Sequence, residues 1–224
     1  MVQFGKRPHL AAYVKDLHIP PLGLAGTLHF PQPCKGLVVF AHGSGSSRFS
    51  PRNTAVASAL NQRGIATLLF DLLTESEEAN RANVFDIALL SERLADVIRH
   101  LEGEPATRVL PIGLFGASTG AAAALVAADK LGGVIKAVVS RGGRPDLAGD
   151  VLDRVQAPTL LIVGGADDVV IELNKAAFER LKGPKELKIV PGASHLFPEP
   201  GALEEVMEYA GDWFERYLAD KSAE

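Results

Sequence analysis

One serine, Ser118, lies at the centre of a run of small residues, Gly-Ala-Ser-Thr-Gly, at positions 116–120. The apolar run over 108–115 is typical of a buried strand, and the alanine-rich run over 121–128 is typical of the start of a helix. Glycines two positions to either side permit a very tight turn, and the hydroxyl then stands at a helix N-terminus, where negative charge is favoured. The pattern predicts a nucleophilic serine; the alternative is a Gly/Ser turn that merely caps the helix.

A serine hydroxyl becomes a good nucleophile only when a base takes its proton, and that base needs a third group to fix its tautomer. Two later apolar runs, 159–163 and 186–190, are typical of strands. The first leads into Asp167 and Asp168, and the second leads into His195. Catalytic groups of α/β sheets gather just beyond the carboxyl ends of strands. We therefore predict that His195 is the base, the alternative being a hydrogen-bonded structural histidine.

Two adjacent aspartates compete for the place of the acid. Asp167 stands three residues after Gly164 and three before Val170, a spacing that lets the chain turn sharply and then enter a helix. Asp168 could face the imidazole instead, with Asp167 capping the helix that begins near Ile171. We favour Asp167.

A tetrahedral intermediate also needs two backbone N–H groups directed at its negative oxygen. Thr119, the residue after the serine, supplies one. The apolar strand expected over 37–41 is followed by a glycine- and serine-rich loop, in which Ser44 is the expected second donor and Gly43 the alternative. His42, in the same loop, is expected to orient it through hydrogen bonds rather than to act as a second base.

Together these motifs resemble the α/β-hydrolases, in particular the dienelactone-hydrolase-like group. The resemblance covers nearly the whole chain. Its segments are 22–28, 42–45, 116–120, 164–167 and 192–195. The chain departs from dienelactone hydrolases proper in one respect, because they use a cysteine where this chain has Ser118. That difference moves the resemblance away from dienelactone as substrate and toward general carboxylesterases.

The resemblance implies the α/β-hydrolase fold, with a mostly parallel central sheet of about eight strands and helices on both faces. Alternating apolar strand and amphipathic helix patterns agree with that architecture. We expect a single domain over 1–224. Larger lipases carry a helical cap between the sixth and seventh strands, but only about 140–158 is available here. We therefore expect a minimal cap or none, and an open active site.

Several further elements are expected from the pattern. Two strands within 16–30, joined at 20–23, should form an antiparallel edge hairpin. The others are a helix from Ser50 and Pro51 to Gly64, a strand over 65–70, a helix over 86–101 and a strand over 135–139. The acidic run 75–78 is expected to be a solvated turn.

Two arginines, Arg141 and Arg144, follow the strand expected at 135–139. At the carboxyl end of a strand they could bind an acidic group of the substrate through their guanidinium groups. The alternative, slightly favoured, is an ion pair with Asp146 or another nearby carboxylate.

Composition narrows the class of protein. A chain of 224 residues, 47% hydrophobic, can bury a substantial core, and its net charge of -4 offers no attraction for nucleic acid. The first 15 residues lack a signal-peptide core, and no apolar run is long enough to span a bilayer. The single cysteine, Cys34, excludes an internal disulfide and a cysteine-based metal site. We expect a cytoplasmic enzyme, monomeric or homodimeric, that uses no metal or organic cofactor.

The predicted function is cleavage of carboxylic esters with small or exposed acyl groups. Ser118 attacks the acyl carbon, His195 moves protons and Asp167 orients His195, while the Ser44 and Thr119 amides hold the oxyanion. The same residues also suit a thioesterase, an amidase or a peptidase. A non-catalytic binding protein on this scaffold is the alternative from another class.

Overall fold

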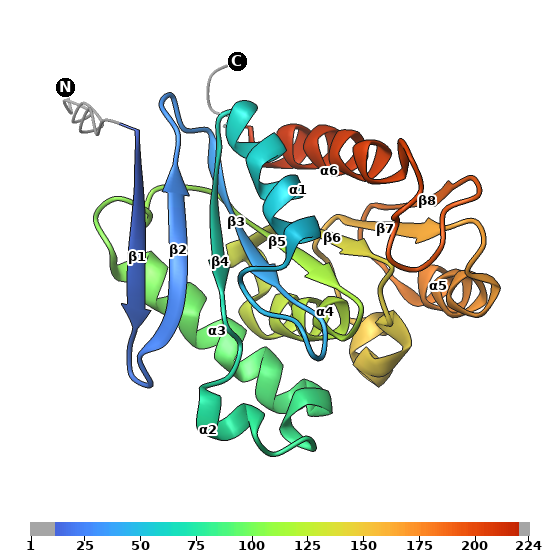
Figure 1. Cartoon of the computed structure of the whole chain (residues 1–224), viewed down its shortest axis with the longest axis horizontal. Helices are drawn as coiled ribbons and strands as arrows, with labels where there is room; N and C mark the ends of the chain where they lie inside the picture. The colour runs from blue at the N-terminus through green and yellow to red at the C-terminus, as the bar shows by residue number, and fades with distance from the viewer. Residues whose placement is uncertain (1–11, 220–224) are drawn as a thin grey trace.

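The computed structural model describes residues 12–219, which form one eight-stranded sheet with helices on both sides (Figure 1). The strand order is β1-β2-β4-β3-β5-β6-β7-β8. The strands are β1 (Tyr13–Ile19), β2 (Leu24–Phe30), β3 (Gly36–Ala41), β4 (Ile65–Phe70), β5 (Ile112–Ala117), β6 (Ile135–Arg141), β7 (Thr159–Gly164) and β8 (Lys185–Val190).

The sheet is mostly parallel, as predicted. β2 runs antiparallel to both of its neighbours, β1 and β4, so the opening hairpin lies at one edge. The other six strands, which lie in the order β4, β3, β5, β6, β7 and β8, are parallel to one another. Their carboxyl ends meet at the same edge, and the loops that follow β3, β5, β6, β7 and β8 are therefore neighbours there.

Helices α1 and α6 cover one face of the sheet, and α3, α4 and α5 cover the other (Figure 1). The helices are α1 (Pro51–Gln62), α2 (Glu75–Glu78), α3 (Ile87–Gly103), α4 (Thr119–Leu131), α5 (Asp168–Arg180) and α6 (Ala202–Leu218). The predicted start of α1 is confirmed, because Ser50 Oγ accepts the Asn53 N–H at 3.4 Å and Pro51 occupies the first turn.

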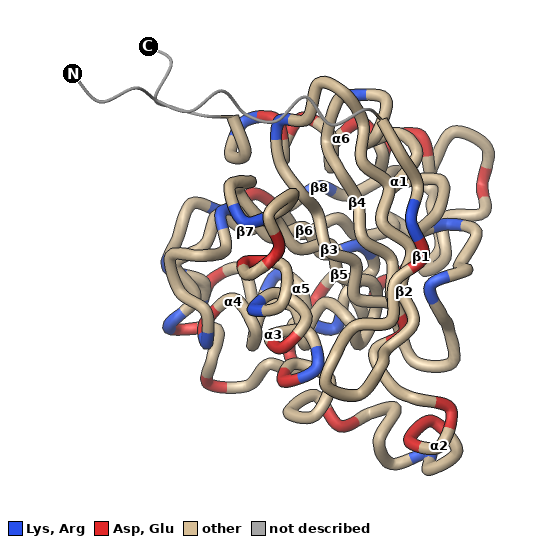
Figure 2. Tube along the Cα trace, turned by 90° about the vertical axis from the view of Figure 1, so that its left-hand side faces the viewer, with Lys and Arg blue, Asp and Glu red and all other residues tan. Residues whose placement is uncertain are grey.

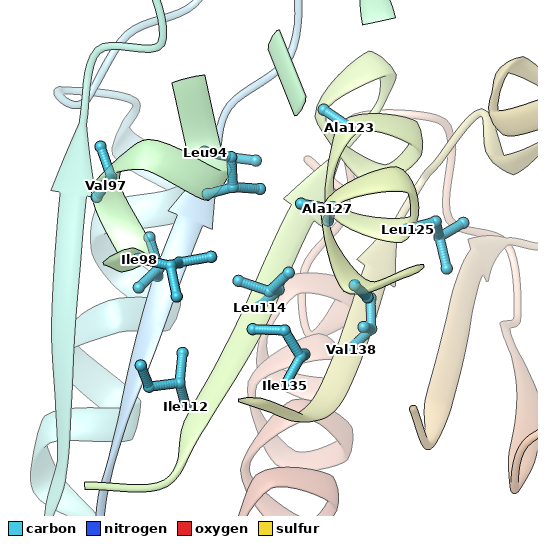
Figure 3. Close-up of a cluster of buried hydrophobic side chains, with 14 of the residues drawn as sticks. Leu94, Val97, Ile98, Ile112, Leu114, Ala123, Leu125, Ala127, Ile135 and Val138 are labelled. Carbon is cyan, nitrogen blue, oxygen red and sulfur yellow. The ribbon is translucent and has the colours of Figure 1, made fainter. Parts of the chain in front are cut away.

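The core has two layers because successive residues of a strand point to opposite faces. Figure 3 shows the layer beneath α3 and α4, where Leu114 of β5 lies between Ile98 of α3 and Val138 of β6. On the other face Phe115 packs against Phe40, with the rings tilted and their centroids 4.8 Å apart. All residues of β5 are buried, which gives the turn after it a rigid base.

The expected strand over 108–115 is wrong at its beginning. β5 starts at Ile112, and the residues before it form a turn in which the Leu110 N–H donates to the Thr107 carbonyl at 2.9 Å. Pro111 has no N–H to add to a sheet, so the apolar run extends beyond the true strand.

The acidic run at 75–78 is a turn with no buried residue, as expected, and it takes the form of the single helical turn of α2. Thr74 and Glu77 make a reciprocal capping box, and Glu77 also pairs with Arg93 at 2.5 Å. Figure 2 shows the acidic colouring gathered on α2, beyond the main body of the sheet.

Only a short 3-10 helix, η3 (Pro145–Asp153), lies between β6 and β7. The expectation of a minimal cap agrees with this, since the segment packs against α4 and α5 instead of standing over the carboxyl edge of the sheet. Within residues 12–219 no helix is long and apolar enough to cross a membrane.

Candidate active site

Ser118 occupies the turn between β5 and α4 with φ 51° and ψ −121°, a region that residues other than glycine rarely adopt. A Cβ on Gly116 would collide with the backbone of Ala121, and one on Gly120 would collide with the carbonyl oxygen of Ala41. The two glycines are therefore required by the closeness of the backbones, as the small-residue pattern predicts. The turn places Ser118 at the N-terminus of α4.

The Ser118 side chain makes no capping hydrogen bond to α4 in the described structure. Its backbone is instead held to the end of β6: the Ser118 N–H donates to the Arg141 carbonyl at 3.3 Å, and the Ser118 carbonyl accepts from the Arg144 N–H at 3.1 Å. The alternative of a simple helix cap does not describe this serine. A strained backbone that leaves the hydroxyl without a structural role suits a nucleophile.

His195 and Asp167 follow neighbouring strands and meet across their loops. His195 Nδ1 lies 2.7 Å from Asp167 Oδ2. Because an ionised carboxylate only accepts hydrogen bonds, Nδ1 carries the hydrogen and Nε2 is left to take up a proton. Asp168 is exposed at the first position of α5, so Asp167 is the aspartate that contacts the imidazole.

The loops that carry the imidazole and the serine meet at the ends of β5 and β6, where Ala117 is paired with Arg141 and the Ser118 N–H donates to the Arg141 carbonyl. Gly142 comes next, and a Cβ placed on it would lie 3.6 Å from Cε1 of His195. Among the described residues no hydrogen bond joins Ser118 Oγ to His195. Catalytic hydrogen bonds are often long without substrate and tighten when it binds.

The loop that carries His195 is fixed on both sides of it. The Ser194 N–H donates to Glu199 at 3.0 Å, and hydrogen bonds from the side chain of Ser194 first, and from its backbone second, lower the pKa of the Glu199 carboxyl. Phe197 is buried, has a φ of 56°, and lies against Gly142. A non-glycine residue in the left-handed region persists only where its surroundings enforce it, so this loop holds His195 in one position.

The two expected oxyanion donors lie together. The Ser44 N–H donates to Oγ1 of Thr119 at 3.0 Å, and Thr119 begins α4, so its own N–H is one that a helix leaves unpaired. Gly43 passes directly over the turn: a Cβ on it would stand 3.1 Å from the Ser118 Cβ. To serve an oxyanion, the Ser44 amide has to exchange the Thr119 hydroxyl for the substrate oxygen.

His42 ties this loop to the end of β4. Its Nε2 accepts the Leu72 N–H at 3.1 Å, and its Nδ1 lies 3.0 Å from the Gly43 carbonyl, to which it donates. Burial lowers the pKa of His42 although the Gly43 hydrogen bond opposes the shift. A neutral imidazole that uses both nitrogens for the backbone has the orienting role expected from the sequence.

The lowered pKa of His42 predicts a loss of stability in acid. Below about pH 6.5 the histidine of the unfolded chain binds a proton, while the burial of His42 opposes protonation in the folded protein. The folded protein therefore becomes less stable as the pH is lowered, by up to about 2 kcal/mol at pH 5 relative to neutral pH. Denaturant unfolding at pH 7.5 and pH 5 measures the loss. His42→Gln should unfold more readily at pH 7.5 but lose less on acidification, whereas His18→Gln, on an exposed β1 position, should lose as much as the unmodified protein. Equal losses in all three proteins would contradict the assignment.

The two arginines after β6 have different surroundings. Arg144 makes a two-pronged pair with Asp146, with Nε and Nη2 at 2.9 and 2.8 Å from the two carboxylate oxygens. This is the structural alternative considered for it. Arg141 is only 6% exposed, and within residues 12–219 the one hydrogen bond of its side chain goes from Nη2 to Asn53 Oδ1 at 3.3 Å.

A small cavity adjoins the site, with a free volume of about 20 Å³. One side is the loop from His42 to Ser46, which carries the expected oxyanion donor, and the other side is apolar. The apolar lining consists of Leu72, Leu73, Val84 and Leu90, and Asp71 and Glu78 are the two carboxylates that also line the cavity. No group of histidine, cysteine and acidic side chains suited to a metal ion occurs among residues 12–219.

These features agree with comparisons to known proteins. Residues 34–208 match the family model described as an alpha/beta hydrolase domain, so the chain belongs to the α/β-hydrolase family. Within that family it is dienelactone-hydrolase-like. The crystal structure of a dienelactone hydrolase from Anabaena variabilis superposes with a TM-score of 0.89 at 52% identity, covering 92% of this chain and 98% of that one.

Two further comparisons concern the fold and the length of the chain. Est1E from Butyrivibrio proteoclasticus has the same fold, with a TM-score of 0.77 at 18% identity over 92% of this chain and 99% of its own. A Mycobacterium tuberculosis protein with the provisional name phosphoribosyl transferase is 61% identical over 198 residues, 88% of this chain. The match covers only 45% of that protein, so the chain spans less than half the length of this curated relative.

Sequence reasoning missed the side chains that support the site from other elements. Arg52 and Asn53 enter from the first turn of α1, and Asn174 of α5 donates to the Gly143 carbonyl at 3.0 Å. A signal for the first two was available. The Ser-Pro start of α1 follows the strand that ends at 41, so the N-terminus of α1 lies at the carboxyl edge of the sheet with the other functional loops.

Proposed function

We propose that this hydrolase cleaves carboxylic esters through an acyl-enzyme formed on Ser118. The observation that carries the proposal is the 2.7 Å contact between His195 and Asp167, beside a serine whose strained turn leaves its hydroxyl free. A helix N-terminus behind the serine and an amide-rich loop over it supply positive potential where the oxyanion develops.

Each residue has one task in this mechanism. Nε2 of His195 takes the Ser118 proton as the hydroxyl oxygen attacks the acyl carbon, and Asp167 stabilises the imidazolium that results. The Thr119 and Ser44 amides donate to the tetrahedral oxyanion. His195 then protonates the departing alcohol and activates a water molecule that releases the acyl group and regenerates Ser118.

Small or exposed acyl groups suit this site best. Nothing built from the β6–β7 connection covers it, and the cavity beside the Ser44 loop is too small for a long acyl chain. Thioesters and amides remain alternative substrates, because the same groups attack any acyl carbon. The transferase name of the Mycobacterium tuberculosis relative refers to a protein more than twice as long as the match, and no feature of the site favours that activity here.

Hydrolysis of p-nitrophenyl esters of increasing acyl length tests the proposal, together with covalent labelling by a fluorophosphonate. We expect turnover that is highest for acetate or butyrate and falls for longer chains, and one label per chain at Ser118. Labelling without ester turnover would transfer the proposal to thioesters or amides. A chain that neither turns over esters nor reacts with the label would be a binding protein on this scaffold.

A further inference from the structure

Arg141 is a buried cation without a counter-ion. Its exposure is 6%, its Nε has no hydrogen-bond partner, and no carboxylate in the described range pairs with it. Arg48, Arg63 and Arg93 are more exposed, yet each forms an ion pair with an aspartate or glutamate. A buried charge without a partner is costly, so this arrangement calls for a function.

The charged side chain that acts on Arg141 has the same sign. Arg52, in the first turn of α1, acts on it by repulsion, and the Nε of Arg52 is also buried without a partner. Burial first, and then Arg52, lower the pKa of Arg141 to about 10, so it stays protonated at neutral pH. The N-terminus of the 12-residue α1 adds its own positive end. Three sources of positive potential therefore lie together, and no carboxylate of residues 12–219 pairs with either arginine.

The cluster is next to the catalytic groups. The Arg141 carbonyl accepts from the Ser118 N–H, and Gly142, the residue after Arg141, lies against His195. The guanidinium carbon is 5.9 Å from the centre of the Phe197 ring, two residues after His195. Arg141 thus lies between the strand end that presents the nucleophile and the loop that presents the base.

We propose that Arg141 and Arg52 form a binding subsite for an anionic group, a carboxylate or a phosphate, carried by the substrate. Only its part in turnover rests on the proposed function; anion binding itself does not. Nε and Nη2 form one edge of the planar Arg141 guanidinium, the edge that binds two oxygens of a carboxylate or phosphate, and Arg144 uses the same two nitrogens to bind Asp146. On that edge Nε has no partner, and Nη2 uses one of its two hydrogens for Asn53 Oδ1 at 3.3 Å.

Anion binding is measured first, without any reaction. Thermal unfolding is followed in sodium phosphate and in sodium succinate, at constant ionic strength adjusted with chloride, for the unmodified protein, Arg141→Met, Arg52→Gln and Arg144→Gln. The unmodified protein and Arg144→Gln should be stabilised by at least one of the two anions, with dissociation constants about tenfold or more lower than in the other variants. The anion that stabilises more strongly identifies the group.

Arg141→Met should fold at least as well as the unmodified protein in chloride, because it removes an uncompensated buried charge. If it does not fold, Arg52→Gln, at a more exposed position, decides the question. Equal stabilisation of all four proteins, or of none, overturns the subsite.

Turnover is measured second, with p-nitrophenyl monoesters of malonate, succinate and glutarate against p-nitrophenyl acetate. The ratio of kcat/KM for the anionic esters to that for acetate should fall about ten- to hundredfold in Arg141→Met and Arg52→Gln, and stay unchanged in Arg144→Gln. Anion stabilisation without ester turnover would sustain the subsite and refute the ester function. Ester turnover, with the same kcat/KM ratio in all variants and no stabilisation by anions, would sustain the ester function and refute the subsite.

Discussion

Replacing Ser118 with alanine should lower kcat for p-nitrophenyl acetate by about 10⁴- to 10⁶-fold. Without the hydroxyl no acyl-enzyme can form, and only the oxyanion amides and substrate binding are left to assist attack by water. Alanine keeps a Cβ on the same strained backbone, so the φ of 51° is neither relieved nor worsened. The thermal midpoint should therefore change little while activity is lost.

The Ser118→Ala assay needs a control in which a serine outside the site is replaced in the same way. Ser58 is exposed on α1 and lies outside the site, so Ser58→Ala should retain full activity and the fluorophosphonate label. Pre-steady-state mixing adds a direct readout, because the unmodified protein should release a burst of p-nitrophenol where deacylation is slow. Retention of more than about one per cent of the rate in Ser118→Ala would mean that another group performs the attack.

The site could be predicted from the sequence because its members stand in short motifs directly after apolar strands. Parallel strands bring their carboxyl ends to one edge, so Ser118, Asp167 and His195 converge although 28 or more residues separate the acid from its partners. The glycines at 116 and 120 signalled a close approach of backbones, and the structure shows which backbones approach.

Other features depend on tertiary contacts that no local pattern encodes. Arg141 and Arg144 are three residues apart with similar surroundings in sequence, yet only Arg144 has a carboxylate within reach. The unpaired state of Arg141 arises because α1 brings Arg52 and Asn53 across to β6. The strand order, in which β4 lies between β2 and β3, likewise follows from packing rather than from any pattern in the strands.

The sequence alone could not decide between Asp167 and Asp168, because neighbouring residues at the start of a helix point in different directions. Asp167→Asn should lower kcat about 10⁴-fold, because an amide nitrogen donates toward Nδ1 and favours the tautomer whose Nε2 carries the hydrogen and cannot accept the serine proton. Asp168→Asn, at an exposed helix position, should change kcat less than about threefold.

Both variants should fold, so their kinetics separate the two roles. Because Asp167 only orients and stabilises the imidazole, its loss should fall on kcat, with KM for p-nitrophenyl acetate nearly unchanged. Small and similar losses in the two variants would mean that neither aspartate supports the base. A large loss in Asp168→Asn alone would mean that this loop changes position when substrate binds, since in the described structure it is Asp167 that lies 2.7 Å from His195.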